Sequence, residues 1–225
     1  MKTRTGYVLG MVVMALLLFF LMPYAIGLLK VLFVTKPALI LRHLQWYLWV
    51  AVGAVAYLFI RKHFNKNIEW MEVFSHELTH ATFTLLSFNK VHSLSATDKM
   101  GGVVSSSGHK TFSDLVMRLA PYCFPLFTYI LLLFRGLITY HGRTIFDVLI
   151  GLTLCFHIIT FKKQTKPHQP DLKHYPLALT CLYILTAHVL NFCIIVKAFF
   201  ANETVFSSFW DMVCHIWDQL LGWFV

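Results

Sequence analysis

Charged residues are scarce in this chain of 225 residues. Only 13% are Asp, Glu, Lys or Arg, about half the share in an ordinary soluble domain, whereas 58% are hydrophobic. The mean hydropathy is correspondingly high, at +0.67. This composition excludes an ordinary soluble globular domain and predicts an integral, multi-pass membrane protein.

Basic clusters and cysteine motifs are also absent. The formal net charge is +9, but Lys and Arg are spread through every loop, so no nucleic-acid partner is predicted. Basic residues distributed in this way are typical of anchoring at the edges of a lipid bilayer. The five cysteines lie in apolar stretches without C-x-x-C spacing, and we interpret them as small buried hydrophobic residues.

Long apolar runs, by contrast, are plentiful. Because a hydrocarbon core about 30 Å thick requires roughly 20 apolar helical residues, the chain has material for about six transmembrane helices. They are predicted at residues 7–29, 38–60, 70–88, 115–134, 144–161 and 177–200, followed by an interfacial amphipathic helix at 205–225. The predicted fold class is therefore an all-α polytopic membrane protein with a single domain, residues 1–225.

Two polar stretches interrupt this helical pattern. In residues 89–113, apolar and polar residues alternate around the turn signal at residues 98–102, which ends in Gly101 and Gly102. This pattern predicts a short re-entrant β-hairpin-like loop after the third transmembrane helix. Residues 162–176 contain three prolines, which forbid a continuous helix and predict an extended or turn backbone.

The third predicted span contains the sequence His-Glu-Leu-Thr-His at positions 76–80. Residues four apart on a helix lie on one face, one turn apart, so the imidazoles of His76 and His80 can bind one cation. Zinc binds neutral imidazole nitrogens at about 2.0–2.1 Å, and a catalytic zinc has three protein ligands. Glu77 is then placed to accept a proton from the attacking water. Random placement of the His and Glu residues would produce this motif about 0.01 times per chain, so chance is a weak explanation.

A third ligand must come from outside this helix. Asp171 is preferred because it lies in the proline-broken segment, where non-helical backbone could return it to a cavity. Asp147 and His157, both in the fifth predicted span, are its rivals. The alternative to a metal site is a set of core groups hydrogen-bonded to neighbouring helices. Three ionisable groups in one turn would need many such partners, whereas one cation compensates all of them.

The whole pattern resembles the site-2 protease-like family of intramembrane zinc metalloproteases. The resemblance covers most of residues 70–175 and rests on the His-Glu-x-x-His motif in an apolar helix, the Gly-Gly-Val-Val sequence at 101–104, and Asp171 about ninety residues downstream. It implies that Zn²⁺ is held by His76, His80 and Asp171, that Glu77 activates the water, and that residues 91–104 form a membrane-embedded β element. Around Asp171, however, the chain lacks the Asn and the Gly that the family usually places beside this residue.

The resemblance implies hydrolysis of peptide bonds in or near transmembrane segments of membrane protein substrates. An unwound substrate could add to the edge of the β element. Substrate contacts are accordingly expected from Gly101, Gly102 and Val103, and from Gln169, whose amide replaces that of the family's Asn.

Two other functions stay open. The first is a membrane metalloprotease of a different lineage with a Glu as third ligand, for which the only Glu beyond the motif is Glu203. The second is a non-enzymatic zinc-binding scaffold or transporter. Such a protein would not need Glu77, so the presence of this residue favours an enzyme.

Overall fold

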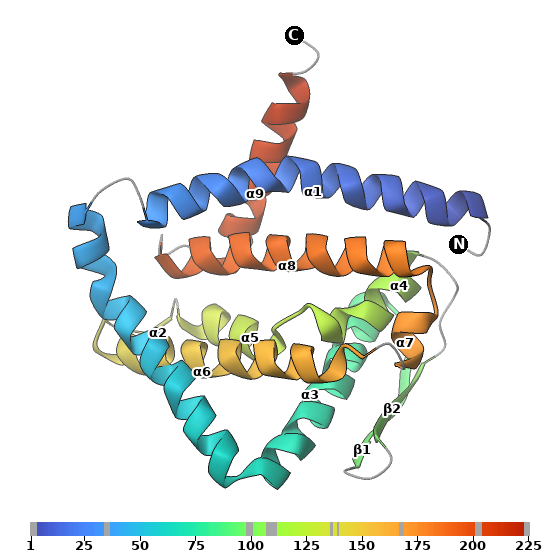
Figure 1. Ribbon diagram of the computed structural model, residues 1–225, viewed down its shortest axis with the longest axis horizontal. Helices are drawn as coiled ribbons and strands as arrows, with labels where there is room; N and C mark the ends of the chain where they lie inside the picture. Colours follow the sequence, from blue (N-terminus) through green and yellow to red (C-terminus); the bar gives the residue numbers. More distant parts are fainter. Residues whose placement is uncertain are drawn as a thin grey trace.

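The computed structural model describes residues 4–33, 37–97, 101–106, 112–135, 137–138, 140–166, 169–200 and 204–222. Over these residues the protein is nearly all helical and has one two-stranded sheet (Figure 1). The strands are β1 (Val91–Thr97) and β2 (Gly101–Ser106). The helices are α1 (Arg4–Phe33), α2 (Pro37–His63), α3 (Asn65–Leu86), α4 (Phe112–Leu119), the 3₁₀ turn η1 (Ala120–Tyr122), α5 (Leu126–Arg135), α6 (Tyr140–Gln164), α7 (Pro170–Lys173), α8 (Leu177–Phe200) and α9 (Val205–Leu221).

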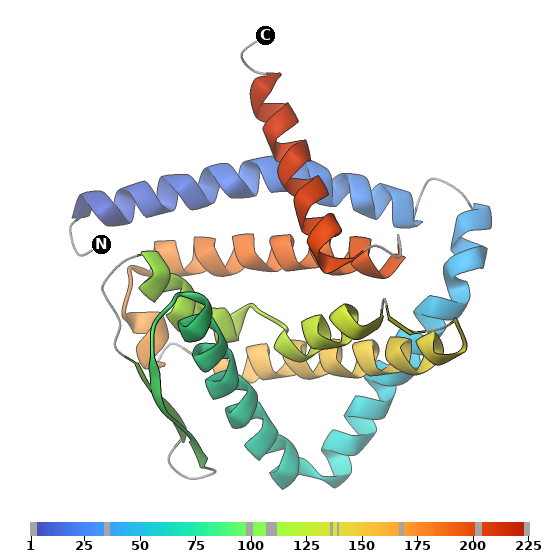
Figure 2. The ribbon, with the colours of Figure 1, turned by 180° about the vertical axis from the view of Figure 1, so that it is seen from behind.

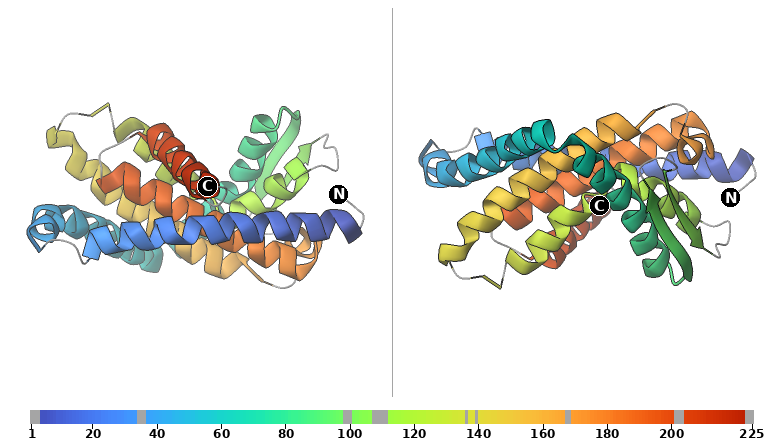
Figure 3. Two further views of the ribbon diagram at one scale, coloured as in Figure 1. Left: turned by 90° about the horizontal axis from the view of Figure 1, so that it is seen from above. Right: turned by 90° about the horizontal axis from the view of Figure 1, so that it is seen from below.

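The long helices α1, α6 and α8 extend along the length of the molecule (Figures 1 and 2). Helix α1 packs along α8, and α2 packs across α6. Helices α2 and α3 form a V, and α9 crosses α1 on the opposite side (Figure 1). Helices α3, α4 and α7 and the two strands gather at the end of the molecule that carries the N-terminus (Figures 1 and 3). Helices α3 and α7, which carry His76, His80 and Asp171, lie at this end.

Fewer membrane-crossing helices are identified than the six predicted. Among the described residues, Arg4–Val31, Gly142–Gln164 and Leu177–Phe199 are each long and apolar enough to cross a membrane. A bent pair, Ser113–Tyr122 with Leu126–Arg135, gives at most a fourth. Helix α3 is not among them, because its middle carries Glu72, Glu77 and the two histidines. These findings support an integral membrane protein but leave the six-span count unconfirmed.

The fourth predicted span, residues 115–134, is not a continuous helix. Helix α4 ends at Leu119, the turn η1 follows, and the chain bends by 87° before α5 begins. Two prolines, Pro121 and Pro125, explain the break, because proline has no N–H to donate and its ring clashes with the preceding turn. One consequence matters for the site: Pro121 cannot donate to the carbonyl of Met117, four residues earlier, so this oxygen is free for another donor.

The strands β1 and β2 pair in an antiparallel sheet, with Leu94 opposite Val104 and Ala96 opposite Gly102. Both strands pack along α3, the helix that carries the His-Glu-x-x-His motif. The residues between the strands, 98–100, lie outside the described part of the chain. The re-entrant position of this sheet in a membrane stays a prediction.

Two glycines allow α2 and α6 to cross in close contact. A Cβ added to Gly53 would overlap the carbonyl oxygen of Val148 on α6, and one added to Gly151 would overlap the carbonyl oxygen of Val50 on α2. The two backbones therefore touch where each presents a glycine, as small residues allow in membrane helix pairs. The C-terminal ends of both helices supply side chains that contact α3.

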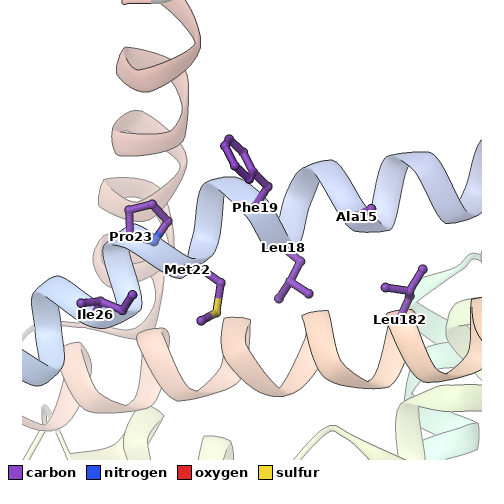
Figure 4. Close-up of a pocket in the computed structure, with 7 residues that line it drawn as sticks. All are labelled: Ala15, Leu18, Phe19, Met22, Pro23, Ile26 and Leu182. Carbon is purple, nitrogen blue, oxygen red and sulfur yellow. The ribbon is translucent and has the colours of Figure 1, made fainter.

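A groove of about 430 Å³ lies between α1 and α8 near Pro23 (Figure 4). Phe19 points away from α8 in this view, whereas Leu182 comes from α8 itself. No ionisable side chain and none of the sequence-predicted site residues lines the groove, which is formed by Ala15, Leu18, Phe19, Met22, Pro23, Ile26 and Leu182. It is an apolar surface feature of the first helix and is separate from the candidate site.

Candidate metal centre

The segment predicted to be extended or turn-like, residues 162–176, forms the end of α6 and one short helical turn. Helix α6 continues to Gln164, and α7 then begins at Pro170. Proline is well suited to the first helical position, because its fixed φ is helical and its missing N–H is not needed there. Asp171 follows at the next position of α7, which packs against α4. Pro170 thus starts the turn that carries Asp171.

His76, His80 and Asp171 form a cluster. The Nε2 atoms of the two histidines are 3.1 Å apart. The Oδ2 atom of Asp171 lies 3.6 Å from Nε2 of His80 and 4.0 Å from Nε2 of His76. Ligand atoms about 2.0–2.2 Å from a tetrahedral zinc ion are about 3.3–3.5 Å apart, so two sides of the observed triangle match a zinc site to within a few tenths of an ångström and the third is about 0.5 Å longer. It is the one such group of His, Cys, Asp and Glu side chains found within the described residues.

The orientation of the His80 ring fixes its tautomer. Its Nδ1 atom lies 2.8 Å from the backbone carbonyl oxygen of Met117. A carbonyl oxygen can only accept, so Nδ1 carries the proton and Nε2 presents a lone pair to the cluster. The carbonyl is available because Pro121 cannot occupy it, which connects the proline break after α4 to the state of the histidine.

The orientation of His76 is fixed through two further bonds. Its Nδ1 atom lies 2.8 Å from Oε1 of Gln164. The Nε2 amide group of Gln164 donates to the backbone carbonyl of Glu72 at 3.2 Å, and this bond determines which end of the amide faces the ring. The amide oxygen therefore accepts from Nδ1 of His76, and the Nε2 atom of this histidine also presents a lone pair to the cluster.

Two lone pairs and a carboxylate oxygen consequently face one another. A proton between the imidazoles would compensate only two of these three acceptors, whereas a metal cation compensates all of them. Two neutral imidazoles and one carboxylate also form a ligand set that zinc binds readily in catalytic sites. The residues present therefore fit the metal that the resemblance implies.

The remaining polar groups complete the surroundings of the cluster. Glu77 is 7% exposed and interacts electrostatically with both His80 and Asp171. Burial disfavours ionisation of Asp171, whereas the positive charge of Arg118, 3.6 Å from its Oδ1, favours it. Tyr122 is fully buried, and its ring lies edge-on to that of His76 with centroids 5.1 Å apart.

The rival third ligands lie elsewhere. Asp147 is buried and accepts a hydrogen bond from Nε of Arg135 at 2.9 Å. His157 lies beside His188 of α8, with ring centroids 6.1 Å apart. Neither belongs to the cluster found in the described part of the chain. Glu203, the candidate third ligand of a different protease lineage, falls outside the described residues.

The residues predicted to contact a substrate occupy two places near this cluster. Gly101, Gly102 and Val103 begin β2, which packs along α3. Gln169 directly precedes α7, and its side chain makes no capping bond to that helix. Both places are adjacent to elements that carry cluster residues, and their role in substrate binding stays a prediction.

Three contributors to the site were not predicted from the sequence: Gln164, the carbonyl of Met117 and Arg118. Gln164 lies 88 residues from His76, so no local pattern joins them. Arg118 was detectable, because it is an isolated charge within a predicted span, and such charges indicate a function. Pro121 was detectable by a different signal. A proline cannot donate to the carbonyl four residues earlier, so it leaves the carbonyl of Met117 free.

One comparison with known proteins identifies a family for this chain. No curated protein and no solved structure matches the chain. A family model described as Peptidase M50B-like matches residues 48–212, a range that contains the His-Glu-x-x-His motif and Asp171. The match covers more than half of the sequence and confirms the resemblance to site-2 protease-like metalloproteases. The chain therefore belongs to the Peptidase M50B-like family.

Proposed function

We propose that this protein is an intramembrane zinc metalloprotease that hydrolyses peptide bonds in or near transmembrane segments of membrane protein substrates. Membership of the Peptidase M50B-like family supports a membrane metalloprotease in general terms. The zinc ion, the residue roles and the substrate class are the specific parts of the proposal.

The convergence of two imidazole lone pairs and one carboxylate oxygen carries the proposal. Outward hydrogen bonds hold both rings, to Gln164 for His76 and to Met117 for His80, in the tautomer that a metal ligand requires. A structural pair of histidines would gain nothing from directing two acceptors at each other and at Asp171. We therefore assign His76, His80 and Asp171 as the zinc ligands.

Glu77 is the proposed general base. When bound, zinc supplies Lewis acidity that polarises a carbonyl group and makes water more acidic. Glu77 accepts a proton from the attacking water and then returns it to the leaving amine. Its position beside the cluster in a largely buried environment favours this role over that of a surface carboxylate. A zinc-binding scaffold or transporter would not need this residue.

The proposed substrate is another membrane helix, which must unwind locally before cleavage because helical hydrogen bonds shield its carbonyl groups. An unwound segment could pair with the edge of the sheet formed by β1 and β2, since main-chain hydrogen bonds would then hold it beside α3. Gly101, Gly102 and Val103 would contact this segment, and Gln169 would contribute an amide from the other side of the site. The proposed partners are thus a membrane protein and the lipid bilayer, with no nucleic acid.

The test compares the wild type with Glu77→Gln, because glutamine keeps the shape of the side chain but cannot accept the proton. Zinc content is measured on purified protein, and new protein N-termini are profiled in membranes of cells that express each form. We expect equal zinc in both proteins, and new N-termini in or near transmembrane segments only with the wild type. Glu69→Gln is the matched control, since Glu69 lies on the same helix and is exposed. Identical N-terminal profiles for the wild type and Glu77→Gln would refute the proposal.

A further inference from the structure

The two carboxylate oxygens of Asp171 face different partners. Oδ2 faces the histidines, at 3.6 Å and 4.0 Å from their Nε2 atoms. Oδ1 faces the Nη1 atom of Arg118, at a distance of 3.6 Å. Arg118 comes from α4 and Asp171 from α7, so the contact joins two elements that no local sequence pattern connects.

The guanidinium of Arg118 is itself held on its other side. Its Nε donates to Oδ1 of Asp114 at 3.0 Å, one helical turn earlier in α4. Oδ2 of Asp114 accepts from the hydroxyl of Tyr175 at 2.7 Å, and Tyr175 is only 9% exposed. Arg118 therefore lies between two carboxylates, and the one that is not a candidate metal ligand is anchored to the core.

This arrangement matters because a carboxylate can bind a metal through one oxygen or through both. A catalytic zinc site holds three protein ligand atoms and keeps one position open. If both oxygens of Asp171 coordinated the metal, the second would take that position. At 3.6 Å the contact with Arg118 is an ion pair rather than a hydrogen bond, and the attraction of the guanidinium for Oδ1 can keep this oxygen away from the metal.

We propose that Arg118 is a positioning residue that restricts Asp171 to one-oxygen metal binding and so keeps the fourth coordination position open. This inference rests on the proposed zinc function. Arg118 acts through Asp171 and has no assigned contact with a substrate. Its loss is expected to reduce hydrolysis by about 10–100-fold while metal stays bound, as for other outer partners of metal ligands.

The test uses cobalt-substituted protein, because the intensity of the visible absorption of Co²⁺ falls when its coordination number rises. Arg118→Gln removes the charge beside Oδ1, so we expect a weaker visible spectrum with full cobalt content. Asp114→Asn keeps the charge of Arg118 and an amide oxygen that can still accept from its Nε, so we expect the wild-type spectrum. Arg143→Gln is the matched control. It removes the same charge from an arginine that contacts the carbonyl of Ile138, far from the cluster in sequence.

Three results would overturn the inference. The first is an unchanged cobalt spectrum in Arg118→Gln. The second is a spectrum in Asp114→Asn that weakens as much as that of Arg118→Gln, which would indicate that the ion pair between Arg118 and Asp114 only stabilises α4. The third requires no variant: X-ray absorption of the zinc-loaded wild type that shows both oxygens of one carboxylate at bonding distance. This measurement decides the matter if Arg118→Gln does not fold. A wild type that binds no metal would instead refute the proposed function itself.

Discussion

Replacement of Gln164 by leucine is expected to weaken metal binding while the fold is retained. The variant preserves the approximate size of the side chain but removes both polar contacts of the amide. His76 then loses the acceptor for its Nδ1–H at 2.8 Å, and the carbonyl of Glu72 loses a donor at 3.2 Å. The imidazole is no longer held in the tautomer that directs its lone pair at the cluster.

The magnitude follows from two terms. A buried donor without a partner costs about 1–3 kcal/mol, and His76 is only 12% exposed, so much of this penalty applies. The ring can escape the penalty by rotation or by transfer of the proton to Nε2, and either change removes a metal ligand. Loss of the partner of a ligating histidine typically lowers metal affinity by about 10–100-fold, which corresponds to about 1.4–2.7 kcal/mol.

The assay is competition for zinc with a chromophoric chelator, measured on detergent-purified protein whose folding is checked by thermal unfolding. Gln164→Glu is expected to bind zinc more tightly than Gln164→Leu, because a carboxylate oxygen can still accept from Nδ1 of His76. Gln219→Leu is the matched control, since Gln219 pairs with His215 on α9 at 3.0 Å and the same chemical change occurs away from the cluster. Wild-type zinc affinity in a folded Gln164→Leu protein would refute the assignment of this amide.

Three further outcomes are expected. The double variant His76→Ala, His80→Ala should fold and bind no stoichiometric zinc, since a single remaining ligand cannot hold the ion; normal zinc content would exclude the site. Gly151→Ala should lower the free energy of unfolding by about 1–3 kcal/mol, because its Cβ would overlap the backbone of α2. Gly27→Ala should be tolerated, because nothing lies within 4 Å of its Cβ. Asp147→Asn should destabilise the fold by about 3–5 kcal/mol, because it leaves a buried arginine without its charged partner, yet zinc content should stay normal; loss of zinc from folded protein would restore Asp147 as a ligand.

The helical period explains which parts of the site could be predicted from the sequence. His76 and His80 are four residues apart on a helix, so their shared face follows from the period alone. Asp171 required a different argument, from the prolines that forbid a continuous helix over residues 162–176 and so allow non-helical backbone to return to a cavity, and the structure brings it to the two histidines. Each of these inferences rests on a local backbone property, which a sequence displays directly.

The missed features depend on packing between distant segments. Gln164 lies in the last turn of α6, a helix that packs against α2 at Gly53 and Gly151, and no pattern within α6 states where this turn will point. The break at Pro121 was present in the sequence, but the apolar run around it favoured a single long helix. Hydropathy reports how well a segment suits a membrane and contains no information on its direction, so it predicts six spans where three helices, or four with the bent pair, are identified among the described residues.

The polarity of α3 is explained by the elements around it. Its buried Glu72 forms ion pairs with Arg61 of α2 at 2.7 Å and with Lys163 of α6 at 2.8 Å. Both cations come from the C-terminal ends of their helices. Its histidines are oriented by the ends of α6 and α4, and their lone pairs face α7. A helix with this many ionisable groups could not be stable alone in an apolar environment, because each group without a partner would cost several kcal/mol. The surrounding helix ends thus compensate the charge of Glu72 and hold the Nδ1 atom of each histidine. The Nε2 lone pairs of the two histidines face the cluster, and they are the groups that a metal cation would satisfy.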